Sequence, residues 1–148
     1  MGKGIQAERD LSDILEDQYG YAALRSPGSG GRTERARPDL LAVKTYEVVH
    51  KEADLVRPSW DVHVVELKSE PDGTATYDRE EVEQLEEYAE RAGAFPWLAV
   101  KPDLRSHDQW YFIPTNEAHE TPEGNYSIRQ QDQEDALSIE EVFGPGGV

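Results

Sequence analysis

The sequence predicts an α/β fold in which a mixed central sheet of about five strands is flanked by helices. Two segments, 6–19 and 78–92, carry apolar residues at helical spacing, which predicts amphipathic helices. Short apolar and β-branched runs lie between and after them, bounded by glycine, proline or polar residues, and these predict strands. The expected order is helix, three strands, helix, two strands and a short terminal helix, within one domain of 148 residues.

The N-terminal part begins with a helix and continues with strands. Leu11, Ile14 and Leu15 share one stripe of the first helix, and Gly20 ends it. Strands are expected at 21–25, 40–43 and 62–66, and a turn-rich loop is expected at 26–31.

The second helix has both a start and a stop signal. Asp78 is expected to cap it, with Glu81 reaching back to complete a capping box, and Gly93 is expected to end it. Its apolar stripe, which predicts core packing, consists of Val82, Leu85, Tyr88, Ala89 and Ala92.

The core is expected to end near residue 114. Residues 110–113 predict an inner strand, and 115–135 predict a polar surface loop. A capping box at 138–141 predicts a short docking helix.

Composition excludes several classes of site. The chain has no cysteine, which excludes disulfides, thiolate nucleophiles and Cys-ligated zinc, and its four histidines show no ligand spacing. His63 alternates with valines, which indicates a structural or surface residue. No apolar run approaches the ~18 residues that cross a bilayer, and the N-terminus lacks a signal-peptide pattern. A soluble, cytoplasmic protein is therefore expected.

The most informative pattern is Pro38-Asp39 followed by Glu66-Leu67-Lys68. Residues two apart on a strand face the same way, so Glu66 and Lys68 would point together toward Asp39 on the next strand. Carboxylate oxygens suit Mg²⁺, which polarises a phosphoryl group, while the lysine amine holds the attacking water and offsets charge. The pattern thus predicts phosphodiester cleavage, and the alternative is a chance D…E-x-K in a very acidic chain.

Several segments together resemble the archaeal Holliday junction resolvases of the Hjc type, in the PD-(D/E)xK nuclease superfamily. They are Lys3-Gly4-x-Gln6-Ala7-Glu8-Arg9-Asp10-Leu11, Arg25-Ser26-x-Gly28-Ser29, Pro38-Asp39-Leu40, Glu66-Leu67-Lys68, and 92–101 with Trp110-Tyr111-Phe112-Ile113. The resemblance covers residues 3–114, with a weaker similarity at 138–144. It implies a restriction-endonuclease-like core and a homodimer that cuts four-way DNA junctions symmetrically with Mg²⁺, for which Mn²⁺ would substitute.

The resemblance also implies roles for individual residues. The catalytic positions are Glu8, Asp39, Glu66, Lys68 and Ser29, with the first three as metal ligands. Arg9 and Arg25 match positions tied to the same site or to DNA contact. The other basic residues expected to contact DNA are Lys3 and, because of the local positive charge of segment 25–37, Arg32, Arg35 and Arg37. The dimer surface is expected on the second helix, at Val82, Leu85 and Tyr88.

Some of these residues have simpler explanations. Glu8 alone also suits the first turn of a helix, where the dipole favours an acid, and Ser29 alone suits a loop. Gln84 and Tyr88 form a Gln-x-x-x-Tyr pair, which is seen beside the active site in exonuclease relatives. The chain departs from the family in a longer loop at 30–36 and a hairpin extension at 46–59.

A net charge of −16 is unusual for a protein that binds DNA, but its distribution is uneven. Residues 1–44 hold seven basic and seven acidic side chains, whereas 45–114 hold seven against sixteen and 115–148 hold one against eight. The acid thus lies away from the cationic segment 25–37, which can bind phosphates. Five lysines among thirty-one acids suggest a halophile, a haloarchaeal-like version of the family.

Two alternatives to junction resolution remain at this stage. One is a nuclease of the same core acting on a flap, a mismatch or a foreign duplex. The other is a noncatalytic DNA-binding or scaffold protein. The intact set of acidic residues argues against this alternative, because a protein without catalytic activity has no need to hold like charges together. Recombination or replication proteins would be further partners of a resolvase.

Overall fold

The computed structural model describes residues 3–26, 37–50, 55–102 and 109–145. Its centre is a five-stranded sheet in the order β1-β2-β3-β5-β6. These strands are β1 (Ala22–Arg25), β2 (Leu40–His50), β3 (Leu55–Glu70), β5 (Phe95–Pro102) and β6 (Tyr111–Pro114). β3 and β5 run parallel, and the other neighbouring pairs are antiparallel. The predicted fold class, a mixed sheet flanked by helices, is confirmed.

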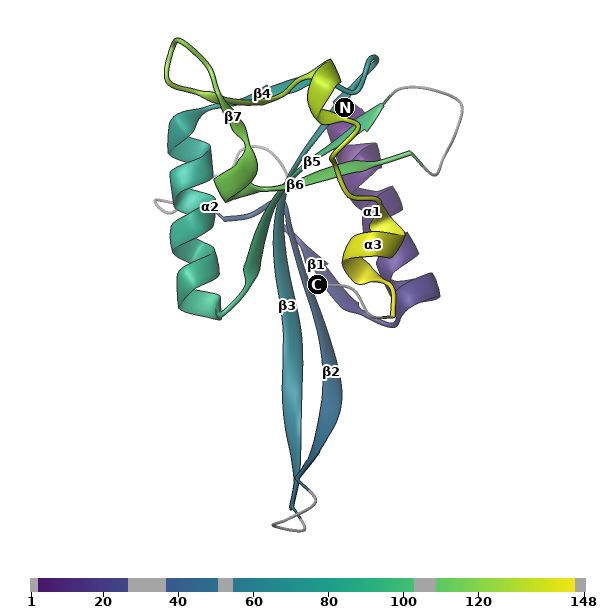
Figure 1. Ribbon diagram of the computed structural model, residues 1–148. Coiled ribbons are helices and arrows are strands. Elements are labelled where there is room, and N and C mark those ends of the chain that lie inside the picture. The colour runs from purple at the N-terminus through teal and green to yellow at the C-terminus, as the bar shows by residue number, and fades with distance from the viewer. Residues whose placement is uncertain (1–2, 27–36, 51–54, 103–108, 146–148) are drawn as a thin grey trace.

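Helices cover both faces of this sheet (Figure 1). α1 (Lys3–Tyr19) and α3 (Ile139–Phe143) pack on one face, and α2 (Arg79–Ala92) packs on the other. Neighbouring residues of β3 serve the two faces in turn, since Val65 is buried on the α1 side and Val64 on the α2 side. Burial on both faces explains why two adjacent positions of β3, Val64 and Val65, are both apolar.

β2 and β3 form a long hairpin that leaves the body of the molecule (Figure 1). Their pairing continues from Tyr46 opposite Ser59 to His50 opposite Leu55, so the described residues of the predicted extension, 46–50 and 55–59, lengthen the hairpin as expected. Thr45 pairs with Trp60, which places Trp60 and Tyr46 on opposite faces of the ribbon.

The prediction of a surface loop over 115–135 is wrong. This segment contains two single-turn helices, η1 (Thr115–Glu117) and η2 (Gln130–Asp132), and the strands β7 (His119–Glu120) and β8 (Tyr126–Ile128). With β4 (Ala75–Tyr77) these strands form a second sheet in the order β4-β8-β7. Ile128 and Tyr77 anchor it in the α2-side core. Strands of two or three residues are too short to produce a recognisable alternation in the sequence.

Two further expectations differ from the structure. The strand predicted as an inner strand, β6, lies at the edge of the sheet, where Phe112 exchanges two backbone hydrogen bonds with Leu137. The cap residue of α2 is Asp78, but its side chain makes no capping hydrogen bond.

The predicted capping box at Ser138 is present. Within the described residues, no helix is long and apolar enough to cross a membrane.

His63 is a fully buried residue of β3, so of its two predicted roles the structural one is correct. Its Nδ1 accepts a hydrogen bond of 3.0 Å from Trp97 Nε1, and its Nε2 is buried without a partner. The rings of Tyr21, Phe95 and Phe143 surround it. Burial lowers the pKa of His63 from 6.5 to about 4, so the folded protein keeps this imidazole neutral.

The buried imidazole predicts a pH-dependent loss of stability. The unfolded chain binds a proton near pH 6.5 and the folded chain near pH 4, so the contribution of His63 is complete above pH 6.5 and declines toward pH 4. The pKa difference between the unfolded and folded chain corresponds to about 3 kcal/mol of the free energy of unfolding. We expect the free energy of unfolding of wild type to fall more steeply over this interval than that of His63→Phe. Equal slopes for the two proteins in urea titrations would contradict this.

Candidate active site

Asp39 and Glu66 meet at one end of the β2–β3 ladder. Leu40 pairs with Val65, so Asp39 and Glu66 occupy the next position on each chain, and their carboxyl groups are hydrogen-bonded to each other. Asp39 Oδ2 also accepts a hydrogen bond of 2.8 Å from the Leu67 N–H. Ser26 fixes the approach to β2, because its N–H donates to the Asp39 carbonyl at 3.1 Å and its hydroxyl donates to the Pro38 carbonyl.

The proximity of these two carboxyls has an electrostatic cost. Burial, followed by the charge of Asp39, raises the pKa of Glu66 to about 9. Burial also raises the pKa of Asp39, although the Leu67 N–H and the Lys68 ammonium oppose this effect. Because the Leu67 N–H stabilises the charge on Asp39, we assign the shared proton to Glu66. The pair is therefore held together as one carboxylate and one carboxylic acid.

Lys68 lies on the same face of β3 as Glu66. Its Nζ is 5.5 Å from the centre of the Tyr77 ring, and its charge lowers the pKa of both Asp39 and Glu66. Tyr77 is fully buried and donates its hydroxyl proton to the Ala99 carbonyl. This fixed ring holds the lysine stem at the edge of the site.

Glu8 approaches the pair from α1. Burial, followed by the charge of Asp39, raises the pKa of Glu8 to about 7, and the Arg25 guanidinium opposes this shift. Glu8 and Arg25 thus lie within electrostatic reach of the same site. Over the described parts of the chain, however, no group of three or more His, Cys, Asp or Glu side chains is placed to hold a metal ion directly. The close pair is Asp39 with Glu66, and Glu8 stands farther out.

A cavity of about 200 Å³ opens beside the carboxyl pair and extends to α2. Its lining consists of Arg37, Pro38, Asp39, Glu66, Glu81, Gln84 and Leu85. Burial raises the pKa of Glu81, and the Lys68 ammonium opposes this shift. The sequence pattern predicts Glu81 as part of the helix cap, but in the structure this residue lines the cavity. The available signal was its position one turn from Gln84 on the same helix face.

The remaining predicted residues are distributed unevenly. Arg37 lines the cavity, and Arg9 is exposed on α1. Four predicted site residues have side chains outside the described part of the structure: Lys3, Ser29, Arg32 and Arg35.

The expected dimer surface on α2 needs correction. Val82 and Leu85 are 1% and 2% exposed, since they pack into the core of their own chain. They have no surface to offer a partner, and of the three predicted positions only the half-buried Tyr88 has any. An apolar helical stripe predicts burial, but it does not distinguish an intramolecular core from an interface.

Several known proteins are similar to this chain in sequence and in fold. The family model described as archaeal Holliday junction resolvase (hjc) matches residues 1–146. The crossover junction endodeoxyribonuclease Hjc of Sulfurisphaera tokodaii is 28% identical over 142 residues, which cover 95% of this chain and 85% of that protein. The Hjc of Sulfolobus acidocaldarius is 27% identical over 143 residues, with the same coverage. The crystal structure of Hjc from Archaeoglobus fulgidus, a Holliday junction resolvase, superimposes with a TM-score of 0.74 and 28% identity, covering 95% of this chain and all of that one.

Proposed function

Because this chain belongs to the archaeal Holliday junction resolvase (Hjc) family, we propose that it resolves four-way DNA junctions by paired phosphodiester cleavage with Mg²⁺. The observation that carries this proposal is the half-buried, hydrogen-bonded Asp39–Glu66 pair beside Lys68. The family is of a nuclease type that normally depends on a metal. Recombination and repair of DNA, carried out in the cytoplasm, are the processes in which such an enzyme acts.

The donor set fits Mg²⁺. Asp39 and Glu66 bring carboxylate oxygens together where burial and their mutual repulsion penalise full ionisation. A divalent cation compensates both charges, and such hard oxygen ligands are those that Mg²⁺ prefers, with Mn²⁺ as a substitute. Asp39 and Glu66 would hold the ion directly, and Glu8 would do so through a water. When bound, the ion supplies Lewis-acid activation of the scissile phosphate.

The side chains around the pair perform the other tasks of the reaction. The Lys68 ammonium orients the attacking water and offsets negative charge on the phosphoryl oxygens. Arg9, Arg25 and Ser29 engage the scissile strand, and the remaining basic candidates bind flanking phosphates: Lys3, Arg32, Arg35 and Arg37.

Paired cleavage needs two sites, and we propose that a second copy of the chain binds to an apolar patch on the α2 side of the sheet. The patch consists of Ala22, Leu24, Val43, Trp60 and Val62. Strand register makes it continuous, since Ala22 pairs with Val43 and Val43 pairs with Val62. Leu24 is 67% exposed and Trp60 is 56% exposed, although large apolar side chains are normally buried. Burial in an interface would remove this area from water.

The test of this function is a cleavage assay on a synthetic immobile four-way junction with Mg²⁺ at molar salt. We expect nicks at symmetric positions in two opposing strands, each strand being labelled separately. Cleavage of a flap or a linear duplex instead of the junction would indicate a related nuclease with another substrate. Binding without any cleavage would indicate a noncatalytic protein of the same fold.

The acidic surface leads to a prediction about salt. At molar salt the Debye length is about 3 Å, so repulsion between the acidic surface and DNA is nearly abolished, as is long-range attraction. Junction binding should then rest on close contacts and junction shape. We expect the dissociation constant to rise by less than about tenfold between moderate and molar KCl, measured by fluorescence anisotropy. The steep loss typical of basic DNA-binding proteins would contradict this.

A further inference from the structure

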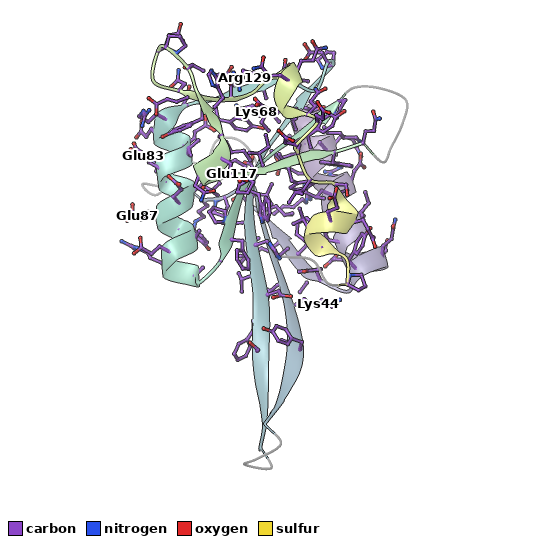
Figure 2. All side chains as sticks on the ribbon, viewed as in Figure 1. Lys44, Lys68, Glu83, Glu87, Glu117 and Arg129 are labelled. Carbon is purple, nitrogen blue, oxygen red and sulfur yellow. The ribbon has the colours of Figure 1, made fainter. Side chains whose placement is uncertain are left out.

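A second groove, of about 690 Å³, begins at Lys68 and runs over the outer side of the small β4-β8-β7 sheet. The inner side of this sheet is apolar, because Ala75, Tyr77 and Ile128 face the core. Figure 2 labels Lys68 and Arg129 in the same upper part of the molecule, and both residues line the groove. The groove therefore joins the catalytic lysine to a region that the sequence motifs do not include.

Hydrogen-bonding side chains form a row across the floor of this groove. Thr76 of β4 pairs with Ser127 of β8, and Ser127 pairs with His119 of β7. Directly opposite residues of a sheet point to the same side, so these three side chains share the outer face of the small sheet, where Thr76 is exposed and Ser127, on the middle strand, is 7% exposed. All three line the groove. Two hydroxyls and an imidazole are thus aligned over three adjacent strands.

The charges around this row nearly cancel. Arg129 is held by Asp132 through two hydrogen bonds of 3.0 Å, which fixes its guanidinium and neutralises its charge. The lining also holds one acidic side chain, Glu70, which offsets the charge of Lys68. The groove therefore offers neutral donors rather than a strong positive field, in contrast to the acidic cavity beside Asp39 and Glu66.

We propose that this groove binds the phosphodiester backbone of the DNA strand next to the scissile phosphate. The inference rests on the proposed nuclease function and extends its substrate site to the small sheet. Hydroxyl and imidazole side chains donate hydrogen bonds to phosphate oxygens and so fix the register of a strand. Lys68 contacts the scissile phosphate in the proposed reaction and also lines this groove, so the next phosphates of the same strand lie over the Thr76 row. Neutral donors release few counterions, which lets this contact operate at high salt.

The test compares two double variants that each remove two hydroxyls. Thr76→Val with Ser127→Ala removes both hydroxyls from the row, whereas Tyr46→Phe with Ser59→Ala removes two hydroxyls from the face of the β2–β3 hairpin opposite the proposed interface. Binding of a fluorescently labelled four-way junction is measured by anisotropy with Ca²⁺ in place of Mg²⁺. We expect about tenfold weaker binding for the first variant, unchanged binding for the second, and the wild-type salt slope for both.

A second pair of variants tests the groove independently of any folding defect. Thr76 is exposed, so Thr76→Glu adds a charge to the groove without entering the core, and Tyr46→Glu adds the same charge to the hairpin face outside the proposed interface. We expect a larger loss of binding for Thr76→Glu than for Tyr46→Glu. If the wild-type chain cuts the junction and the Thr76 variants bind it with wild-type affinity, the groove proposal is wrong and the proposed function stands. A wild-type chain that neither binds nor cuts the junction overturns both the groove and the proposed function.

Discussion

Asp39→Asn and Glu66→Gln should each reduce junction cleavage by about a thousandfold or more while leaving junction binding largely intact. Each change replaces one carboxyl oxygen by an NH2 group. The side chain keeps its shape but can no longer carry a negative charge. Loss of one ligand charge weakens metal binding and the activation of the phosphate, which is worth several kcal/mol of barrier. The measurement is the single-turnover cleavage rate with enzyme in excess, together with the dissociation constant of the same junction.

Stability provides a second readout for these variants. Because burial and the charge of Asp39 raise the pKa of Glu66 to about 9, the metal-free fold keeps this carboxyl protonated at neutral pH, whereas the unfolded chain releases the proton. This difference destabilises the metal-free fold at neutral pH. Glu66→Gln should therefore unfold no more easily than wild type without metal. Glu83→Gln, on the exposed side of α2 (Figure 2), is the matched control and should change neither cleavage nor stability. Full cleavage by either site variant would remove Asp39 and Glu66 from the mechanism.

Leu24→Glu combined with Trp60→Ser should convert the proposed dimer into a monomer. Both side chains are more than half exposed, so the fold of one chain does not depend on their burial. Their replacement places a charge in the proposed interface and removes its largest apolar contact. The measured mass should fall from twice 16.7 kDa to that of one chain in sedimentation equilibrium. The monomer should nick one strand of a junction in place of cutting two.

The opposite face of the hairpin provides the control for this experiment. Tyr46 is 45% exposed and, unlike Trp60, lies outside the proposed interface. Tyr46→Ser should leave the mass and the paired cleavage unchanged. A double variant that stays dimeric, or a Tyr46 variant that dissociates, would show that the second copy binds elsewhere.

The carboxyl pair could be predicted from sequence because strand geometry determines it. Glu66 and Lys68 stand two residues apart, which places them on one face of β3, and Asp39 precedes the strand that pairs with it. The end of α2 at Gly93 could also be predicted, because a glycine readily adopts the left-handed backbone conformation (φ of 65°) that ends a helix. These features depend on interactions between residues close in sequence or on adjacent strands.

Other features depend on distant packing and could not be predicted in this way. Glu81 has the spacing of a capping residue, but it lines the cavity beside Glu66 because of how α2 packs on the sheet. Val82 and Leu85 form a stripe that suits an interface as well as a core. The small sheet pairs β4 with β8, strands about fifty residues apart in the chain, and no local pattern predicts that contact.

The most direct test of the central claim is a cleavage panel with wild-type protein. Four-way, flap and linear DNAs of equal length are incubated at molar salt with Mg²⁺ or with EDTA. We predict rapid paired cleavage of the four-way junction with Mg²⁺, little cleavage of the other two DNAs, and none of any DNA with EDTA. Equal cleavage of all three substrates, or undiminished cleavage in EDTA, would contradict a metal-dependent resolvase built on Asp39 and Glu66.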